Sequence, residues 1–389
     1  MMNWGKIIML LTFTVIMLGL SLLVSSLITL RWTATTELYL STKILIAVFL
    51  ALFFMAPPLL RCPPDGITGT ICTILTYIAY FIFVCIFLFF CFMLVRDVVW
   101  GVGRMLGINW PPLFQPSAVL KANIYLLAVV VFLSGWALYE GTKVPNVKKV
   151  MIYTNKVNEP FTIALLPDIH VHRALSAKKL KGIIDKTNEL NPDAIALAGD
   201  IIDDTPDTIK DLTPILSEFK AKYGVFAVDG NHEVYLGSKQ ARDIFQKNNI
   251  TYLNNQSVVL RPDIVISGVP DMRSYKNPPN FKEALPETEA YTVLLAHTPK
   301  MFDMEGNISD LQLSGHTHGG QIFPFHILAR RSNKYLAGLI QKNGRSLYVS
   351  RGAGQWGPQM RLFAPSEITL ISIYPRLSQF TSENRRPEK

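Results

Sequence analysis

The sequence predicts an α/β domain that follows an all-α region of apolar helices. Residues 1–147 carry eight Lys and Arg and four Asp and Glu, whereas residues 148–389 carry thirty and twenty-five. The first half of the charged part alternates short apolar runs with amphipathic segments, which is typical of a parallel sheet with helical crossovers. Its second half is richer in apolar runs of strand length and favours a second sheet.

The apolar part is predicted to form a transmembrane region of about four helices, at residues 7–30, 44–60, 67–95 and 122–139. A helix needs about 20 apolar residues to cross a bilayer, so the first and third runs are long enough and the other two are near the limit. Five tryptophans lie near the ends of the runs, where interfacial aromatic rings gather. No run contains an ionisable residue, which favours an anchor over a transporter or channel.

Charge and cysteine content exclude several classes of function. The net charge of +9 divides into about +4 and +5 between the two parts, and the charged part lacks the basic block of nucleic-acid binders. All four cysteines lie in or beside the apolar part, so the remainder has no thiolate metal site. Six basic residues flank one side of the runs and five the other. The positive-inside rule therefore selects no orientation.

The charged part is predicted to be one domain over residues 148–375, followed by a polar tail at 376–389. We expect strands at 161–166, 194–198, 225–228, 264–269, 291–296, 311–313, 347–350 and 368–373. Helices are expected at 177–190, 207–220 and 239–247, with Ser176 as the N-cap of the first. Residues 142–149 are expected to be a basic connector at the level of the lipid headgroups.

Polar side chains that can bind a metal follow the ends of five predicted strands. They are Asp168 and His170, Asp200, Asn231 and His232, His297, and His316 and His318. Strand ends line up along one edge of an α/β sheet, so we expect these side chains to share one crevice. His316 and His318 alternate with small residues, which predicts that both imidazoles project from the same side of an extended segment.

The ligand types indicate a transition-metal site. They offer nitrogen and oxygen but no sulfur, which suits Mn, Fe, Zn or Ni. One metal would use about four ligands, and the set is large enough for two metals that share a carboxylate. Two metals about 3.5–4 Å apart can clamp a phosphoryl oxygen and acidify a bridging water. With few carboxylates the pair stays net positive, which favours an anionic substrate.

The ordered motifs resemble those of a known superfamily. They are Asp168-x-His170, Gly199-Asp200, Gly230-Asn231-His232-Glu233, His297 and Gly315-His316-Thr317-His318. In this order they are similar to the five blocks of the calcineurin-like metallophosphoesterases, and the resemblance covers about residues 155–375. The continuation Gly319-Gly320-Gln321 resembles the membrane-attached bacterial phosphohydrolases of the GHTHGGQ type. The resemblance implies a four-layer αββα sandwich of two mixed sheets.

The resemblance also implies a role for each motif residue. Asp168, His170 and His318 would bind one metal, and Asn231, His297 and His316 a second. Asp200 would bridge both metals. His232 would not be a ligand but would face the scissile phosphate as an acid or charge stabiliser, and metal-bound hydroxide would attack phosphorus in line, without a covalent enzyme intermediate. One departure is Pro167, where the family often has Ser.

Other candidates have a functional and a structural interpretation. Arg173 and Arg351 could each bind a substrate phosphate. Alternatively, Arg173 lies in a solvent-exposed loop and Arg351 has a structural role in a glycine-rich turn. Glu233 could orient an imidazole or could be the acid of a helix N-terminus. His326, Arg330 and Arg331 could face anionic headgroups or form a solvated loop. Residues 272–286 could form a lid.

The predicted function is a membrane-anchored dinuclear phosphoesterase acting on a phosphomonoester, a phosphodiester or a pyrophosphate. Its expected location is the cell membrane, as a multi-pass protein, with the bilayer and a phosphate ester as partners. A lipid-linked substrate fits the apolar region, and a tethered phosphodiesterase with a soluble substrate is the alternative. A non-enzymatic scaffold or sensor would be expected to lack a ligand, and none is missing.

Overall fold

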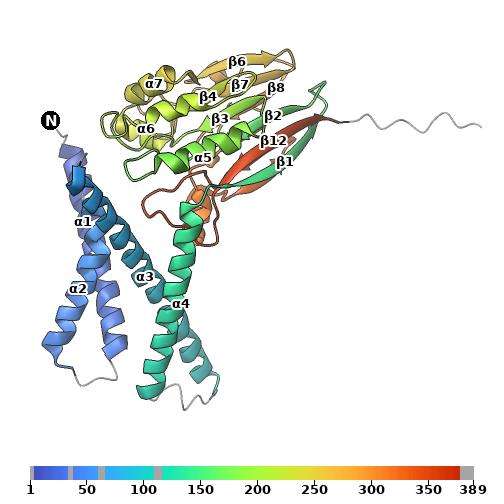
Figure 1. The fold of residues 1–389 in the computed structure, drawn as a ribbon. Helices are drawn as coiled ribbons and strands as arrows, with labels where there is room; N and C mark the ends of the chain where they lie inside the picture. The colour runs from blue at the N-terminus through green and yellow to red at the C-terminus, as the bar shows by residue number, and fades with distance from the viewer. Residues whose placement is uncertain (1–3, 34–37, 60–65, 109–115, 377–389) are drawn as a thin grey trace, which may run out of the picture. The chain divides into compact units, whose positions relative to one another are not determined.

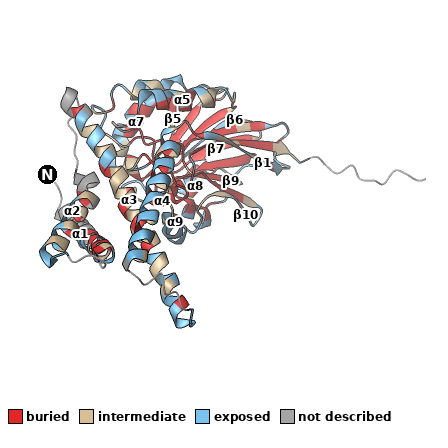
Figure 2. Cartoon of the chain, turned by 60° about the horizontal axis from the view of Figure 1, so that its bottom comes forward, coloured by how far each residue is buried: buried red, intermediate tan, exposed pale blue. Residues whose placement is uncertain are grey.

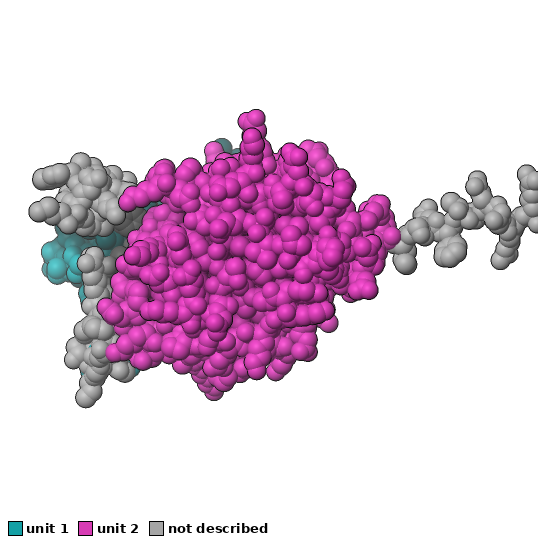
Figure 3. Space-filling model, turned by 90° about the horizontal axis from the view of Figure 1, so that it is seen from above, with its two compact units in different colours: residues 1–142, 357–362 teal, residues 143–356, 363–389 magenta. Residues whose placement is uncertain are grey.

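The computed structural model describes residues 4–33, 38–59, 66–108 and 116–376. The chain divides into two compact units, which Figure 3 shows in two colours. The first unit contains residues 1–142 and 357–362, and the second contains residues 143–356 and 363–389. The division near residue 142 comes earlier than the predicted one at 147, because a strand begins at Asn146. Most of the predicted tail, residues 377–389, lies outside the described residues.

The first unit consists of four apolar helices, which Figure 1 labels. They are α1 (Trp4–Thr33), α2 (Leu40–Leu59), α3 (Gly66–Met105) and α4 (Pro116–Thr142). Among the described residues, two stretches are long and apolar enough to cross a membrane, Ile71–Met105 and Ser117–Thr142. The expectation of four spanning helices is thus corrected to two. The described apolar stretches of α1 and α2 have only 10–17 residues, which is short for a bilayer core about 30 Å thick.

Helix α3 extends beyond its apolar run, and ion pairs lie at its charged end. Asp97 Oδ1 lies 2.8 Å from an Arg96 guanidinium nitrogen, and Asp97 Oδ2 lies 3.0 Å from Arg31 Nε on α1. Only 33% and 17% of the apolar windows of α3 and α4 are buried, and Figure 2 colours much of these helices tan and pale blue, as intermediate and exposed residues. The core helix of a soluble protein would be mostly buried, so this exposure supports α3 and α4 as candidate membrane spans.

The second unit contains two mixed six-stranded sheets. The first has the order β1-β12-β2-β3-β4-β5 and the second the order β10-β11-β9-β8-β7-β6. The strands of the first sheet are β1 (Asn146–Thr154), β2 (Phe161–Leu165), β3 (Ala194–Ala198), β4 (Val225–Val228), β5 (Ile250–Tyr252) and β12 (Glu367–Pro375). Those of the second are β6 (Gln256–Arg261), β7 (Ile264–Gly268), β8 (Tyr291–Leu295), β9 (Leu311–Ser314), β10 (Gly338–Lys342) and β11 (Arg345–Val349).

Alternation along the strands divides the core into layers. In β3, Ile195 and Leu197 pack in the cluster formed with the helical residues of α5 and α7. Ala194, Ala196 and Ala198 belong to the other cluster, which contains side chains from both sheets. A strand buried on both faces is continuously apolar, which is why the AIALA run was recognisable. The two mixed sheets of the α/β fold are therefore confirmed.

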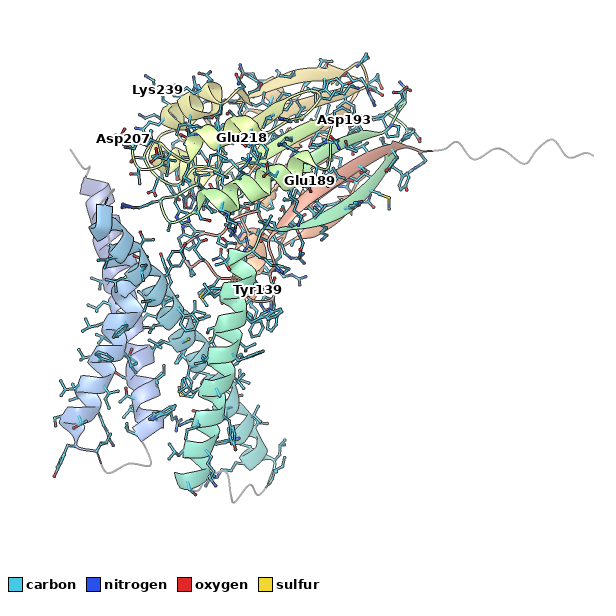
Figure 4. All side chains as sticks on the ribbon, in the orientation of Figure 1. Tyr139, Glu189, Asp193, Asp207, Glu218 and Lys239 are labelled. Atoms are coloured by element: carbon cyan, nitrogen blue, oxygen red, sulfur yellow. The ribbon has the colours of Figure 1, made fainter. Side chains whose placement is uncertain are left out.

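Helices lie beside both sheets. They are α5 (Ala177–Asn188), α6 (Asn231–Leu236), α7 (Ser238–Lys247), α8 (Phe281–Ala284), α9 (Phe325–Asn333) and the 3-10 helices η2 (Thr213–Glu218), η3 (Pro299–Asp303) and η4 (His318–Gly320). Ser176 caps α5 as expected, because its Oγ accepts a hydrogen bond from Lys179 N at 3.2 Å. Asp193, labelled in Figure 4, joins the starts of β2 and β3 by accepting from Thr162 N and Oγ1.

Three expected elements are different in the structure. The helix expected at 207–220 is reduced to η2, since Pro214 removes a helical donor and favours a helix start instead. The second half of the connector expected at 142–149 belongs to β1, which pairs in parallel with β12 from Asn146 opposite Glu367. The insertion at 272–286 includes α8, whose Phe281 is buried, so this segment is anchored to the domain rather than free along its length.

Candidate metal centre

The ends of parallel strands in both sheets position the centre. Asp168, Asp200 and Asn231 follow β2, β3 and β4, which are neighbours in the first sheet. His297 and His316 follow β8 and β9, which are neighbours in the second. Backbone hydrogen bonds continue past the strands, from Asp168 N to Gly199 O at 2.9 Å and from Gly315 N to His297 O at 3.1 Å. The predicted convergence at the strand ends is present.

The first group of potential ligands is Asp168, His170 and His318. One ligand atom of each lies within 4.8 Å of the others, and all three residues are buried. His170 Nε2 is 3.0 Å from His318 Nε2, and His318 Nε2 is 3.8 Å from Asp168 Oδ1. His170 Nδ1 lies 2.7 Å from Asp203 Oδ1. A histidine whose Nδ1 donates to a carboxylate presents its Nε2 lone pair to a cation.

The second group is Asp200, His297 and His316. His297 Nε2 lies 3.1 Å from Asp200 Oδ2 and 3.2 Å from His316 Nδ1. His297 Nδ1 is 2.9 Å from Ala198 O, so this nitrogen donates and Nε2 is left for a ligand role.

Asn231, which follows β4, is the remaining predicted ligand and offers its side-chain oxygen Oδ1. In the described part of the chain, its buried Oδ1 has no hydrogen-bond partner. A buried polar atom without a partner costs about 1–3 kcal/mol. A cation coordinated by this oxygen would remove that cost, so the donor set fits divalent metals.

His232 lies between Asp200 and a carboxylate that the sequence interpretation did not include. His232 Nδ1 is 2.8 Å from Asp203 Oδ1, and its Nε2 is 3.9 Å from Asp200 Oδ2. His170, Asp200 and His232 also form a third group within 4.8 Å. Distances alone therefore allow His232 as a ligand or as a proton donor.

Asp203 holds both His170 and His232 through one oxygen, at 2.7 and 2.8 Å. The available signal was its spacing, since it is the second carboxylate after β3 and lies three residues after Asp200. Glu233 has a different role: its carboxylate accepts from four backbone amides, those of Gly230, Asp200, Ile201 and Ile202. It fixes the loop after β3, which is closer to the helix N-terminal interpretation than to the orientation of an imidazole.

The backbone at the centre is unusual. Five of the seven predicted metal ligands have positive φ, namely Asp168 (56°), His170 (52°), Asp200 (54°), His316 (71°) and His318 (50°). Non-glycine residues rarely adopt this region, and such strain gathers at functional sites. The expectation that His316 and His318 project from one extended segment is wrong, because both are left-handed and their imidazoles enter different groups.

Two glycines allow the close approach of the loops. A Cβ atom at Gly230 would lie 2.1 Å from Asp200 Oδ1, and one at Gly315 would lie 2.5 Å from Asp168 Oδ2. Because no Cβ is present, the carboxylates can approach the backbone that follows each glycine. His232 N donates to Asp200 Oδ1 at 2.8 Å, and His316 N donates to both Asp168 oxygens at 3.0 Å. The motif glycines are thus required by contact with the carboxylates.

The electrostatics match a site built for cations. Burial raises the pKa of Asp168 to about 6. Burial alone would lower the pKa of His297, but Asp200 raises it to about 10, and Asp203 likewise raises the pKa of His170 to about 9. Burial and the charge of His297 lower the pKa of His316 to about 3. Protons on His170 and His297 thus compensate the carboxylates, and bound cations would displace them.

The two arginines predicted to contact substrate are both near the site motifs. Arg351 packs its side chain over Gly319, where a Cβ would lie 3.0 Å from Arg351 Cγ, and its guanidinium lies 3.1 Å from Glu367 Oε2. Arg173 is fixed through its backbone, since its N donates to Asp204 Oδ2 at 2.9 Å. Substrate binding by either residue stays a prediction.

Arg273 is a third basic candidate, which the sequence interpretation missed. It follows β7 and donates to the buried Asp271 from its N at 3.0 Å and from its guanidinium at 3.4 Å. Asp271 also accepts from Thr298 Oγ1 at 2.6 Å, directly after His297. The charge of Arg273 contributes, after burial and His297, to the lowered pKa of His316. Arg273 therefore lies within electrostatic reach of the second ligand group.

Comparison with known proteins gives the family. Residues 161–320 match the family model described as calcineurin-like phosphoesterase. The chain is 36% identical over 265 residues to an uncharacterized metallophosphoesterase of Helicobacter pylori strain J99, covering 66% of this chain and 71% of the relative. It is 36% identical over 261 residues to one of Campylobacter jejuni, covering 64% and 69%. It is 31% identical over 279 residues to a transmembrane protein with metallophosphoesterase domain of Danio rerio, covering 66% and 64%. The chain belongs to the calcineurin-like metallophosphoesterases and is a metal-dependent phosphoester hydrolase.

Proposed function

We propose that the protein is a membrane-anchored dinuclear phosphoesterase that hydrolyses a phosphate ester or pyrophosphate carried by a lipid. The observation that carries the dinuclear part is the place of Asp200. Its carboxylate lies 3.1 Å from His297 and also belongs to the group with His170. One buried carboxylate within reach of both groups is suited to bridge two cations.

The ligand assignment follows the two groups. Asp168, His170 and His318 would hold one cation, Asn231, His297 and His316 the other, and Asp200 both. The nitrogen and oxygen donors suit Mn, Fe, Zn or Ni. When bound, the two cations supply an acidified water and a positive clamp on the phosphoryl oxygens. The products form by direct in-line displacement at phosphorus, without a covalent bond to the chain.

The chain's own residues would move the proton and bind the anion. Burial would lower the pKa of His232, but the hydrogen bond with Asp203 and the charges of Asp200 and Asp203 together outweigh burial and raise the pKa. A protonated His232 can give its proton to the leaving oxygen, while Asp203 holds the ring. Arg273 and Arg351 would bind the remaining phosphate oxygens.

The membrane part of the proposal is supported by the apolar helices. Helices α3 and α4 contain the two candidate spans, which would make the chain a multi-pass protein of the cell membrane. An enzyme held in a bilayer meets lipid-linked phosphates at high local concentration. A tethered enzyme with a soluble phosphodiester substrate is the alternative.

Activity on an aryl phosphate tests the catalytic assignment, with the full chain in lipid nanodiscs and Mn²⁺ present. Asp200→Asn and His232→Ala should each reduce kcat by about 10²-fold or more, because each removes a charge or proton donor used in the transition state. Asp207→Asn, at an exposed residue labelled in Figure 4, is the matched control. Full activity in the Asp200→Asn chain would overturn the proposal.

The substrate class is tested separately. The same full chain is given a long-chain phospholipid phosphate ester and a short-chain, water-soluble ester of the same headgroup. A higher kcat/KM for the long-chain ester supports a lipid-linked substrate, and an equal or lower value supports the tethered alternative. Any shortened chain used for comparison must begin no later than Asn146, because a later start removes part of β1.

A further inference from the structure

The turn that carries His316 and His318, residues 315–321 (the metal turn), continues into an exposed surface that is both apolar and basic. Helix α9 directly follows this turn, and none of its residues is buried. Two aromatic residues of the last loop, Trp356 and Phe363, are also exposed, by 58% and 69%. We call this surface the α9 patch; it consists of Phe325, Ile327, Leu328, Arg330, Arg331, Trp356 and Phe363.

Direct contacts connect the patch to the metal turn. Gln321 Nε2 donates to Trp356 O at 2.8 Å, and Trp356 N donates to Gln321 Oε1 at 3.1 Å. The ring of Phe323 lies 5.9 Å from that of Phe363. The Trp356 ring is 6.3 Å from the ring of His232. Two residues of the patch, Trp356 and Phe363, therefore lie beside the metal turn, and Trp356 also lies near the proposed proton donor.

The composition of α9 does not suit an aqueous surface. A nine-residue helix is marginal in water unless one face is packed. Here Ile327 and Leu328 are each 60% exposed. The apolar residues precede two arginines in the last turn. Aliphatic and aromatic side chains beside exposed arginines are typical of helices that lie at a membrane interface.

The patch contains two arginines, Arg330 and Arg331, in the last turn of α9. In the part of the chain that the structure describes, neither Arg330 nor Arg331 has a carboxylate within 4.0 Å. The neighbouring Lys334 differs, since its Nζ lies 2.7 Å from Asp303. Two unpaired arginines next to an apolar surface complement anionic lipid phosphates.

The connection of the chain also indicates a lipid partner. Trp356 and Phe363 flank residues 357–362, which belong to the unit of apolar helices. Within that unit, Arg361 N donates to Ala137 O at 2.8 Å, and a Cβ at Gly141 would lie 2.4 Å from Gln359 O. These contacts are at the C-terminal end of the candidate span Ser117–Thr142. The end of a span lies at headgroup level, where aromatic residues gather.

We propose that the α9 patch binds the anionic headgroup surface of a bilayer. Its apolar side chains enter the boundary between headgroups and acyl chains, and its two arginines bind lipid phosphates. The inference rests on the proposed membrane anchoring but not on the proposed substrate. It gives the metal turn a partner on its outer side, so that phosphates at the lipid surface are close to the centre.

Photocrosslinking in the full chain tests the proposal. Benzoylphenylalanine replaces Ile327 in one chain and Val259 in a matched chain, since both are exposed aliphatic residues of the second unit, by 60% and 68%. Each chain is placed in nanodiscs of phosphatidylcholine with about a third phosphatidylglycerol and is irradiated. We expect lipid adducts at position 327 to exceed those at 259 severalfold.

The arginines are tested in the same chain. Arg330→Gln with Arg331→Gln should lower the adduct yield at 327 about fivefold or more in anionic discs, and much less in discs of phosphatidylcholine alone. Equal lipid adducts at 327 and 259 would overturn the proposal, and so would adducts of 327 mainly with a second copy of the chain. Hydrolysis of a soluble aryl phosphate should be unchanged by the double substitution, which separates this test from the test of catalysis.

Discussion

At the scale of single residues, Asp203 links a metal ligand to the proposed proton donor. Its Oδ1 lies 2.7 Å from His170 Nδ1 and 2.8 Å from His232 Nδ1. Burial would lower the pKa of His232, and the Asp203 hydrogen bond is the largest cause that raises it. Asp203→Asn should therefore lower this pKa and move the alkaline limb of the kcat profile to lower pH, by about one unit.

The measurement is kcat against pH with an aryl phosphate at saturating Mn²⁺. Asp204→Asn is the control, because the Asp204 carboxylate accepts from Arg173 N and the structure gives it no hydrogen bond to His232. An alkaline limb that stays in place in Asp203→Asn, with lower kcat at every pH, would show that Asp203 acts only through metal binding.

Arg273 gives a second prediction at this scale. Its guanidinium and backbone are held by Asp271, beside the second ligand group. Arg273→Ala should raise KM for a phosphate ester about tenfold with a smaller effect on kcat, because a clamp on the bound anion is lost. Arg273→Lys should restore part of the loss, and Arg242→Ala, at an exposed arginine of α7, should have no effect. A KM equal to that of the unchanged chain would exclude Arg273 from the site.

At the scale of elements, the sequence showed the strands that are buried on both faces and concealed the edge strands. β2, β3 and β8 are short apolar runs, and their ends correctly located the candidate ligands. β1 is mostly exposed or half-buried and contains Lys148 and Lys149, so it resembled a basic connector. Only pairing with β12, far along the chain, makes it a strand.

Part of the candidate site was also beyond sequence patterns. Residue types and strand ends located the ligands, but the left-handed backbone of five of them depends on contacts between loops. The partners of Asp203 and the place of Arg273 likewise depend on how segments meet after folding. Spacing within one segment does not contain this information.

Gly230 lies at the junction between β4 and α6, and its substitution should affect both stability and metal content. Gly230 has φ of −95°, so alanine is allowed there by the backbone, but its Cβ would lie 2.1 Å from Asp200 Oδ1. Gly230→Ala should displace Asp200, destabilise the fold by about 1–3 kcal/mol and reduce the bound metal from about two ions per chain toward one. Elemental analysis of the purified chain measures the metal content. Gly101→Ala adds the same methyl group in open space and should keep both ions.

At the scale of the whole molecule, the two units differ in how they place their apolar side chains. The candidate spans leave most of theirs unburied, whereas the second unit encloses its own apolar core between and beside its sheets. The chain passes between the units at residues 142, 356 and 362. Because the metal ligands all lie in the second unit, cations should stabilise that unit and leave the apolar helices unaffected.

Removal of metal at different pH values tests this separation. The pKa values of His170 and His297 are about 9 and 10 in the fold, against an ordinary 6.5. Without cations, the protonated imidazoles therefore stabilise the fold, and this contribution is complete below about pH 6.5. This contribution is lost as the pH rises toward 9 and 10. Cations bind more tightly as the protons leave. The difference in unfolding temperature between metal-loaded and EDTA-treated chains should therefore widen from pH 6 to pH 9, and should reach about 5–10 °C.

Near-UV circular dichroism in nanodiscs measures the unfolding of the second unit. The far-UV signal that persists at higher temperature measures the helices of the first unit. A chain with Asp168→Asn and Asp200→Asn has lost two ligands and should show almost no difference between metal and EDTA at any pH. If the unchanged chain behaves in the same way, the clustered histidines do not hold stabilising cations. If EDTA instead lowers the unfolding temperature of the helices equally, the two units unfold together and share one cooperative structure.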